Sequence, residues 1–343
     1  MTTQTTRRAR RGGALSILVS ALALATAASS AIGQLVPDRL YYGVDRTAPM
    51  TVTRPAGTDA SAELTLRVHN AINAGASSTA SVAEGGVDVA ALFPELWRGS
   101  GRFAYVQLYA GEQAVGSPVV IQPMLTPVHA VERPGAVPIQ YNARQRVFSG
   151  VRAFVDKQAV LETSAGDIVI RLRSDVAPNH SWNFRHLVEG GYYTDVIFHR
   201  IVDARNGREP FVIQVGDPTG VGTGGPGYQI DLEDTRSLPH NFGVLSMART
   251  GIQSDPAAPN TGGSQVFIAL SRGGTAFLDG RYSTFGEAVE GADAILSIAA
   301  TPVTSGDRPL DEPPAIRRAY LRDAPPIGSK PAPLRRPEQA GGR

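Results

Sequence analysis

Arg200 and Gln214 are polar residues inside two apolar segments. Arg200 stands within residues 196–202 (VIFHRIV), a run that predicts a buried strand, where an unpaired charge is costly to bury. Gln214 stands in the next apolar run, FVIQVGD. A guanidinium keeps its charge and presents a rigid fork of donors, so Arg200 is suited to act as a fixed cationic donor. A structural ion pair on a strand is the alternative.

Few other residues offer chemistry. The chain has no cysteine, which excludes thiolate nucleophiles, disulfides and cysteine-based metal sites. His180 and His186 lie six positions apart, on different sides of any helix, so we expect no zinc site and no cofactor. Residues 220–225 (GVGTGG) match the dinucleotide fingerprint, but Pro226 follows where a helix is needed, which indicates a loop between strands.

The composition is that of a folded protein. The 343 residues are 42% hydrophobic and 19% charged, enough for two domains. The net charge is only +2 and the arginines are spread along the chain apart from clusters near the termini. We therefore expect no nucleic acid as a partner.

Residues 1–33 have the pattern of a signal peptide. RRARR at 7–11 is a basic region, and 14–31 is apolar and ends in small residues suited to cleavage. The strongly apolar part stops near Ala25, short of the ~20 residues that span a bilayer. We expect export to the periplasm or the exterior, with no stable membrane span after cleavage. A single membrane anchor is the alternative, and the export route stays open.

Residues 34–155 predict a small β-rich, sandwich-like domain of unknown role. They contain no acid pair, nucleophile or ligand cluster, so spacing, docking or oligomerisation is the expected role. Prolines in 126–138 suggest a linker. The predicted elements are strands at 64–69, 102–109 and 115–122, and a short helix in 88–97 interrupted at Pro94.

Residues 156–323 have a different sequence pattern, in which short apolar strands are separated by glycine-rich loops. A hairpin turns at 165–167, and a helix follows from Pro178 to the glycines at 190–191. Many short strands with two helices argue for a β-barrel, which closes on itself and leaves no free edge. Residues 324–343 are expected to be a disordered tail. The later predicted elements are strands at 243–248, 264–270, 282–289 and 315–322 and a helix at 291–300.

Several motifs in one order and spacing resemble the cyclophilin-type peptidyl-prolyl cis–trans isomerases. They are FHRIV…FVIQVGDPTGVGTGGPGY, LSMART…PNTGGSQVFI and FLDGRYSTFGEAVEG, and the resemblance covers about residues 157–322. It implies a mainly β fold, namely a closed eight-stranded antiparallel barrel capped by two helices, with a substrate groove on its outer wall. The implied function is isomerisation of X-Pro bonds, with proline-containing segments of other proteins as partners. Together with the predicted signal peptide, this implies that the partners are other exported proteins.

The resemblance also assigns roles to residues. Arg200 matches the catalytic arginine, and Gln214 matches the glutamine that bonds the substrate backbone and helps to hold the arginine. Period 2 places Val212 and Gln214 on one face, and likewise Gln265 and Phe267. The resemblance implies substrate binding by Phe211, Val212, Ala248, Arg249, Gln265, Phe267, Phe277, Leu278 and Tyr282.

The chain departs from the family pattern near the groove. The segment 203–210 (DARNGREP) replaces a two-residue turn, Val212 stands where many members have Met, and Arg249 stands where Asn is frequent. Tyr282 occupies the place of a common His, and Phe277 that of a tryptophan. A non-catalytic module that binds proline segments, a chaperone or an envelope scaffold is therefore the alternative function.

Overall fold

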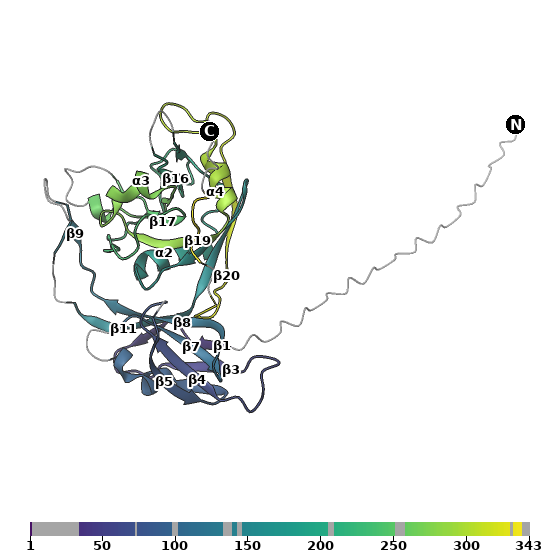
Figure 1. The fold of residues 1–343 in the computed structure, drawn as a ribbon, viewed down its shortest axis with the longest axis vertical. Coiled ribbons are helices and arrows are strands. Elements are labelled where there is room, and N and C mark those ends of the chain that lie inside the picture. The colour runs from purple at the N-terminus through teal and green to yellow at the C-terminus, as the bar shows by residue number, and fades with distance from the viewer. Residues whose placement is uncertain are drawn as a thin grey trace. The chain divides into compact units, whose positions relative to one another are not determined.

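The structure is a computed structural model that describes Met1 and residues 34–72, 74–97, 102–132, 139–142, 146–204, 209–250, 258–329 and 332–337. The predicted signal peptide, residues 1–33, lies outside the described residues apart from Met1. Residues Ala31–Arg343 form one compact unit. Its strands belong to an N-terminal group of sheets and to one large C-terminal sheet (Figure 1).

The N-terminal strands form two antiparallel sheets that bury their inward side chains in a common apolar core. A short helix α1 (Val89–Leu92) and a 3-10 turn η1 (Pro94–Leu96) follow β6. The smaller sheet contains β1 (Gln34–Pro37), β3 (Pro49–Thr53) and β6 (Gly85–Asp88). The larger sheet runs in the order β2 (Tyr41–Gly43), β11 (Phe148–Val155), β8 (Gln113–Leu125), β7 (Ala104–Ala110), β4 (Leu64–His69) and β5 (Ala76–Val82).

Between β8 and β11 the chain leaves the six-stranded sheet as an arm, which we define as residues 126–132, 139–142 and 146–147. Within it β9 (Ala130–Val131) pairs with β10 (Gln140–Tyr141). The base of the arm is closed by a hydrogen bond from Thr126 N to Val147 O of 3.0 Å. The proline-containing segment 126–138 was expected to be a linker, yet its described part belongs to the arm.

Among the described residues the C-terminal sheet has nine strands. Its outer strands, β14 and β15, are separated in the chain only by Phe198 and His199, so the sheet curls back toward its own beginning. The expected single strand at 196–202 is therefore two strands, because Val196 pairs with β20 whereas Arg200 pairs with β16. The order is β14 (Val196–Ile197), β20 (Ala315–Asp323), β12 (Lys157–Thr163), β13 (Gly166–Leu172), β19 (Thr284–Glu290), β17 (Val244–Met247), β18 (Val266–Ala269), β16 (Val212–Val215) and β15 (Arg200–Val202).

Two helices lie against this sheet (Figure 1). Their buried apolar residues belong to the core of the sheet. Helix α2 (Pro178–Glu189) begins with a proline at its first position, where the missing N–H costs nothing. Helix α4 (Ala292–Ala299) follows Gly291, whose φ of 97° and close approach to Asp167 O exclude a side chain. The remaining helical turns are η2 (Ala258–Asn260), α3 (Arg272–Thr275) and η3 (Ala276–Leu278).

The chain crosses from one group of sheets to the other at Asp156, the single residue between β11 and β12. Asp156 N donates to Pro118 O at 2.8 Å, and Arg185 of α2 donates from Nη1 to Val155 O at 2.6 Å. Phe154 and Trp182 pack beside this crossing with ring centroids 4.9 Å apart. The junction is therefore buried and hydrogen-bonded on both sides.

The described residues of the C-terminal tail contact both groups of sheets, although their composition predicts disorder. Ile327 is buried, and its N–H donates to Gln107 Oε1 at 2.9 Å. Farther on, Leu334 N donates to Ala288 O at 3.1 Å and Arg336 Nη1 donates to Leu270 O at 2.9 Å. Apolar burial and backbone hydrogen bonds thus hold the tail against the sheets.

Candidate active site

Arg200, Gln214 and Phe267 lie in one row across three neighbouring strands. Arg200 on β15 is opposite Gln214 on β16, and Gln214 is opposite Phe267 on β18. Residues opposite one another in a sheet direct their side chains to the same face. Arg200 Nη1 lies 3.5 Å from Gln214 Oε1, and its Nη2 lies 3.8 Å from Asp307 Oδ2. Both contacts are long, and the arginine side chain is 39% exposed, so its donors remain accessible.

Beside this row lies a small cluster of apolar side chains that is separate from the core of the sheet, and it is the candidate substrate pocket. Val212, Phe267 and Leu278 are buried in it, and Phe211, Ala248 and Tyr282 pack around them. Val202 also belongs to this cluster, although the sequence analysis did not select it. The structure therefore brings six of the expected substrate-binding residues into one cluster.

Phe277 stands at the rim of the pocket and differs from the residues inside it. Its ring stacks on Phe211 with centroids 5.7 Å apart and an angle of 12° between the planes. It is nevertheless 62% exposed. An exposed aromatic ring beside a pocket is available to cover a bound side chain.

The inserted segment 203–210 leaves Arg200 close to Phe211. Phe211 N donates to Val202 O at 2.9 Å, which closes the hairpin above the insertion, and the guanidinium carbon of Arg200 lies 5.7 Å from the Phe211 ring centroid. Residues 205–208 of the insertion lie outside the described residues. The length of the insertion therefore does not separate the cation from the pocket.

The two glutamines connect the arginine to a glycine-rich loop. Gln214 Nε2 donates to Gln265 Oε1 at 2.9 Å, and Gln265 Nε2 donates to Gly224 O at 2.9 Å. Asp217 holds this loop by accepting hydrogen bonds from the N–H groups of Gly224 at 2.9 Å and Gly222 at 2.6 Å. The loop that resembled a dinucleotide fingerprint thus wraps around a carboxylate of its own chain.

Ala248 and Arg249 form the opposite side of the pocket. Ala248 N donates to Gln265 O at 2.9 Å, which attaches this segment to β18. The Arg249 guanidinium lies over the Tyr282 ring, 4.8 Å from its centroid, and its Nε donates to Arg281 O at 3.0 Å. The arginine side chain therefore lines the wall of the pocket instead of extending into solvent.

A buried histidine supports the pocket from behind, and sequence reasoning missed it. His240 stacks on Phe267 with centroids 5.8 Å apart. Its Nδ1 lies 2.8 Å from Asp279 Oδ1 and its Nε2 lies 3.0 Å from Ser246 Oγ. Burial lowers the pKa of His240, although the Asp279 carboxylate opposes the shift. No local pattern signals this role, because the three partners of His240 come from three separate segments.

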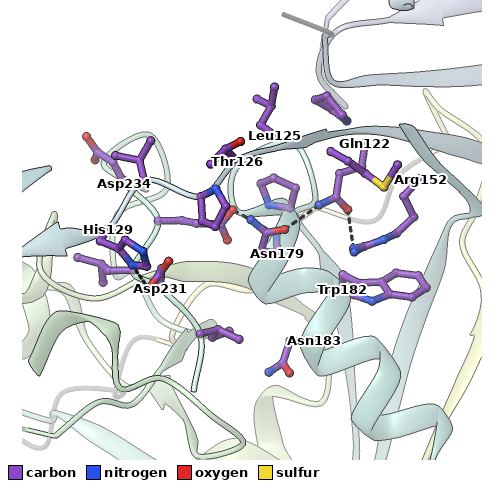
Figure 2. Close-up of a pocket in the computed structure, with 18 of the residues that line it drawn as sticks. Gln122, Leu125, Thr126, His129, Arg152, Asn179, Trp182, Asn183, Asp231 and Asp234 are labelled. Atoms are coloured by element: carbon purple, nitrogen blue, oxygen red, sulfur yellow. Dashed lines mark hydrogen bonds and ion pairs between the residues drawn. The ribbon is translucent and has the colours of Figure 1, made fainter. Parts of the chain in front are cut away.

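A cavity of about 1140 Å³ lies away from this pocket, between the arm, helix α2 and the segment 228–234 (Figure 2). Trp182, Tyr141 and Arg152 are among its lining residues, and the expected substrate-binding residues are not. Among the described residues, no cluster of histidine and carboxylate side chains is suited to hold a metal ion. In the same part of the chain no helix has the length and apolar character needed to cross a bilayer.

Comparison with known proteins gives consistent matches. The family model for "Cyclophilin type peptidyl-prolyl cis-trans isomerase/CLD" matches residues 159–321. The protein named "Peptidyl-prolyl cis-trans isomerase-like 1" of Aspergillus fumigatus is 40% identical over 168 residues, which are 48% of this chain and 95% of the relative. "Peptidyl-prolyl cis-trans isomerase ppi1" of Schizosaccharomyces pombe is 41% identical over 165 residues, 47% of this chain and 97% of that protein.

A solved structure of a Cryptosporidium parvum cyclophilin type peptidyl-prolyl cis-trans isomerase, in the presence of the dipeptide Ala-Pro, also matches. It is 31% identical, with a TM-score of 0.42, and the match covers 48% of this chain and 98% of that one.

Proposed function

The chain belongs to the cyclophilin-type peptidyl-prolyl cis–trans isomerases, EC 5.2.1.8, and from this premise we propose that residues 156–323 isomerise X-Pro bonds at the pocket described above. The proposal is carried by one observation, the row of Arg200, Gln214 and Phe267 beside a separate apolar pocket. In this proposal the pocket receives the proline ring. Gln214, Gln265 and the backbone of Ala248 and Arg249 hold the peptide on either side.

The proposed chemistry is stabilisation of a twisted peptide bond. Rotation about an X-Pro bond faces a barrier of ~18–20 kcal/mol, because amide resonance keeps the bond planar. When the bond twists, the prolyl nitrogen regains a lone pair and becomes a hydrogen-bond acceptor. A donor that meets this lone pair binds the twisted form better than either planar form, and only such differential binding accelerates the step. The accessible N–H groups of Arg200 supply this donor.

The test is replacement of Arg200. We expect Arg200→Ala to lower kcat/KM on a proline-containing peptide by about 10²-fold, within one to three decades, since loss of one electrostatic donor costs about that much. Arg200→Lys should retain more activity, because it keeps the charge without the fork of donors. Arg318→Ala is the matched control, since Arg318 lies on β20 and pairs with Glu162 at 61% exposure. Full activity in folded Arg200→Ala protein would contradict the mechanism.

The second candidate is a non-catalytic module that grips proline-containing segments. Asp307 favours it, because a carboxylate 3.8 Å from Arg200 competes for the same guanidinium. The two functions differ in one measurement, which is NMR exchange spectroscopy on a peptide with a cis–trans equilibrium. Binding without accelerated exchange would support the module, and accelerated exchange would support the enzyme.

We also propose that the protein is exported and assists the folding of other exported proteins in a bacterial envelope. The basic and apolar pattern of residues 1–33 supports a signal peptide and a periplasmic or extracellular location. N-terminal sequencing of the mature protein from a cell fraction tests it. Cleavage near Ala31 or Gly33 is the expected result, and an intact Met1 in the mature protein would contradict export.

The finer account of the fold belongs to the same proposal. We propose that the curled nine-stranded sheet corresponds to the closed eight-stranded barrel of the family, with β14 and β15 meeting across Phe198 and His199. We further propose residues 34–155 as an added β-sandwich domain, because its two sheets share an apolar core of their own.

A further inference from the structure

The arm reaches the segments that border the pocket. Asn260 Nδ2 donates to Ala130 O on the arm at 2.7 Å, while Asn260 Oδ1 accepts from Leu232 N at 3.1 Å. The same Leu232 is buried against Ala130 and Ile139 of the arm. His129 Nδ1 lies 2.9 Å from Asp231 Oδ1 (Figure 2). Three contacts of different kinds therefore hold the arm against residues 231–232 and 260.

One further contact joins the arm to the wall of the pocket itself. Glu132 Oε2 accepts a hydrogen bond from Arg249 Nη1 at 3.2 Å, and the two side chains are only 14% and 7% exposed. A buried guanidinium needs a counter-charge, since an uncompensated charge in such a site is costly. Glu132, a residue of the N-terminal region, supplies that charge.

From Arg249 the contact continues to the floor of the pocket. The guanidinium lies over Tyr282, and the Tyr282 ring meets Phe267 edge-on with centroids 5.7 Å apart at 76°. Glu132, Arg249, Tyr282 and Phe267 thus form a continuous series of contacts. The series leads from the arm to Phe267 at the floor of the pocket.

We propose that Glu132 is a positioning residue of the substrate groove, and that the arm of the N-terminal region sets the affinity of the groove for proline-containing peptides. The proposal rests on the proposed function of the same pocket. Without the carboxylate, Arg249 is drawn toward solvent. Tyr282 then loses the cation over its ring, and the wall of the pocket loosens.

The open cavity beneath the arm strengthens the inference. The cavity separates the described residues 126–129 from helix α2, so this part of the arm does not pack continuously against the helix (Figure 2). The position of β9 and Glu132 depends instead on the contacts with residues 231–232, 249 and 260. Because the arm is held by these few contacts, loss of one of them is expected to shift the residues at the others.

The expected effect is on binding rather than on the chemical step. Arg200 is held by β16 and Asp307, and the interactions described for it do not involve the arm. We therefore expect Glu132→Ala to raise KM about tenfold with kcat within about twofold. The tenfold change corresponds to about 1.4 kcal/mol, as expected when one charged hydrogen bond is lost.

The experiment uses the full chain and a blocked tetrapeptide with the sequence Ala-Ala-Pro-Phe, with kcat and KM determined separately by NMR line-shape analysis. Glu132→Asp keeps the charge and should restore part of the affinity, whereas Glu132→Gln should resemble Glu132→Ala. Glu112→Ala is the matched control. Glu112, like Glu132, is a glutamate of the N-terminal region that pairs with an arginine, but its side chain is 90% exposed. Its KM should equal that of the wild type.

A double-mutant cycle separates positioning from simple destabilisation. If Glu132 acts through Arg249, then adding Glu132→Ala to Arg249→Ala changes KM by less than about twofold. Equal effects of Glu132→Ala in both backgrounds would overturn the proposal, as would an unchanged KM in folded Glu132→Ala protein. Thermal unfolding of each variant identifies any loss of folded protein.

Failure of the proposed function gives a different result. If the wild type binds the tetrapeptide without accelerating its exchange, the catalytic proposal fails, and the dissociation constant from the same NMR titration replaces KM. A tenfold weaker dissociation constant for Glu132→Ala still supports the role of the arm. An unchanged constant, or a wild type that does not bind the peptide, overturns it.

Discussion

At the scale of single residues, a series of hydrogen bonds connects Arg200 to Asp217, a carboxylate that does not touch it. Asp217 fixes Gly224, Gly224 O accepts from Gln265, Gln265 accepts from Gln214, and Gln214 accepts from Arg200. A side chain at position 224 is excluded, because its Cβ would lie 2.0 Å from Asp217 Oδ1. The polar row of the site is thus anchored by a short backbone loop.

The ionisation of Asp217 makes a testable prediction for acid stability. Burial opposes its charge, but the hydrogen bonds from Thr219 Oγ1 and from the N–H groups of Gly224, Thr219 and Gly222 lower its pKa to about 2. The folded pKa therefore lies below the unfolded value of ~3.9. The carboxylate stabilises the fold above about pH 4, and this contribution is lost as the pH falls through about 2.

The measurement is urea unfolding of the wild type and of Asp217→Asn between pH 5 and pH 2. We expect the variant to be less stable by about 1–2 kcal/mol at pH 5, with the gap narrowing toward pH 2. A gap that stays constant with pH would show that the charge of Asp217 is not what holds the loop.

At the scale of elements, helix α2 is capped from outside its own segment. Its N-cap residue Ala177 has no side-chain acceptor, and Glu233 takes that role by accepting from Asn179 N at 3.1 Å and His180 N at 3.0 Å. The same carboxylate contacts His180 Nδ1 at 2.6 Å. A negative charge at a helix N-terminus is also favoured by the helix dipole.

We predict that Glu233→Ala lowers the free energy of unfolding by about 1–3 kcal/mol, because two helix N–H groups lose their acceptor in a partly buried site. Urea unfolding measures this change. Glu84→Ala is a suitable control, since Glu84 also accepts from a backbone N–H, that of Arg54, but at the surface. An equal loss in both variants would contradict a specific capping role.

Elements that depend on local pattern were predictable, and those that depend on distant partners were not. The alternation of 64–69 corresponds to β4, and the helix expected at 291–300 is α4 at residues 292–299. The run at 196–202 was taken as one strand because its two halves look alike, yet their partners, β20 and β16, differ. The cap from Glu233 has no local signal either, since it joins residues more than fifty positions apart.

The candidate site shows the same division. The family resemblance predicted that Phe211, Val212 and Phe267 lie together, and they belong to one apolar cluster because β16 and β18 are neighbouring strands. Glu132, His240 and Asp307 were not predictable, because each enters the site from a segment whose sequence carries no catalytic pattern. Long-range packing decides their positions.

At the scale of the whole molecule, the two groups of sheets meet around a buried carboxylate. Asp156 is only 3% exposed, and burial raises its pKa to about 7 against the opposing charge of Arg185. Its folded pKa therefore lies above the unfolded value of ~3.9. The native state binds the extra proton between these values, so this group makes the protein less stable as the pH rises from about 4 to 7.

We predict that Asp156→Asn removes this dependence. At pH 8 the variant should be more stable than the wild type by on the order of 2 kcal/mol, while at pH 4 the two should be similar. Urea unfolding at both pH values is the measurement, and Asp167→Asn at an exposed position of β13 is the control. A variant that is less stable than the wild type at pH 8 would mean that the charged form of Asp156 is the one the junction requires.

The contact between Ile327 and Gln107 also has a consequence for the order in which the chain folds. Gln107 is fully buried in the N-terminal strands, and its Oε1 accepts from a residue that lies 220 positions later in the chain. Because synthesis proceeds from the N-terminus, the hydrogen bond from Ile327 to Gln107 forms only after the residues between them have been made. Closure of this part of the N-terminal strands therefore follows synthesis of β20, the last strand of the C-terminal sheet among the described residues.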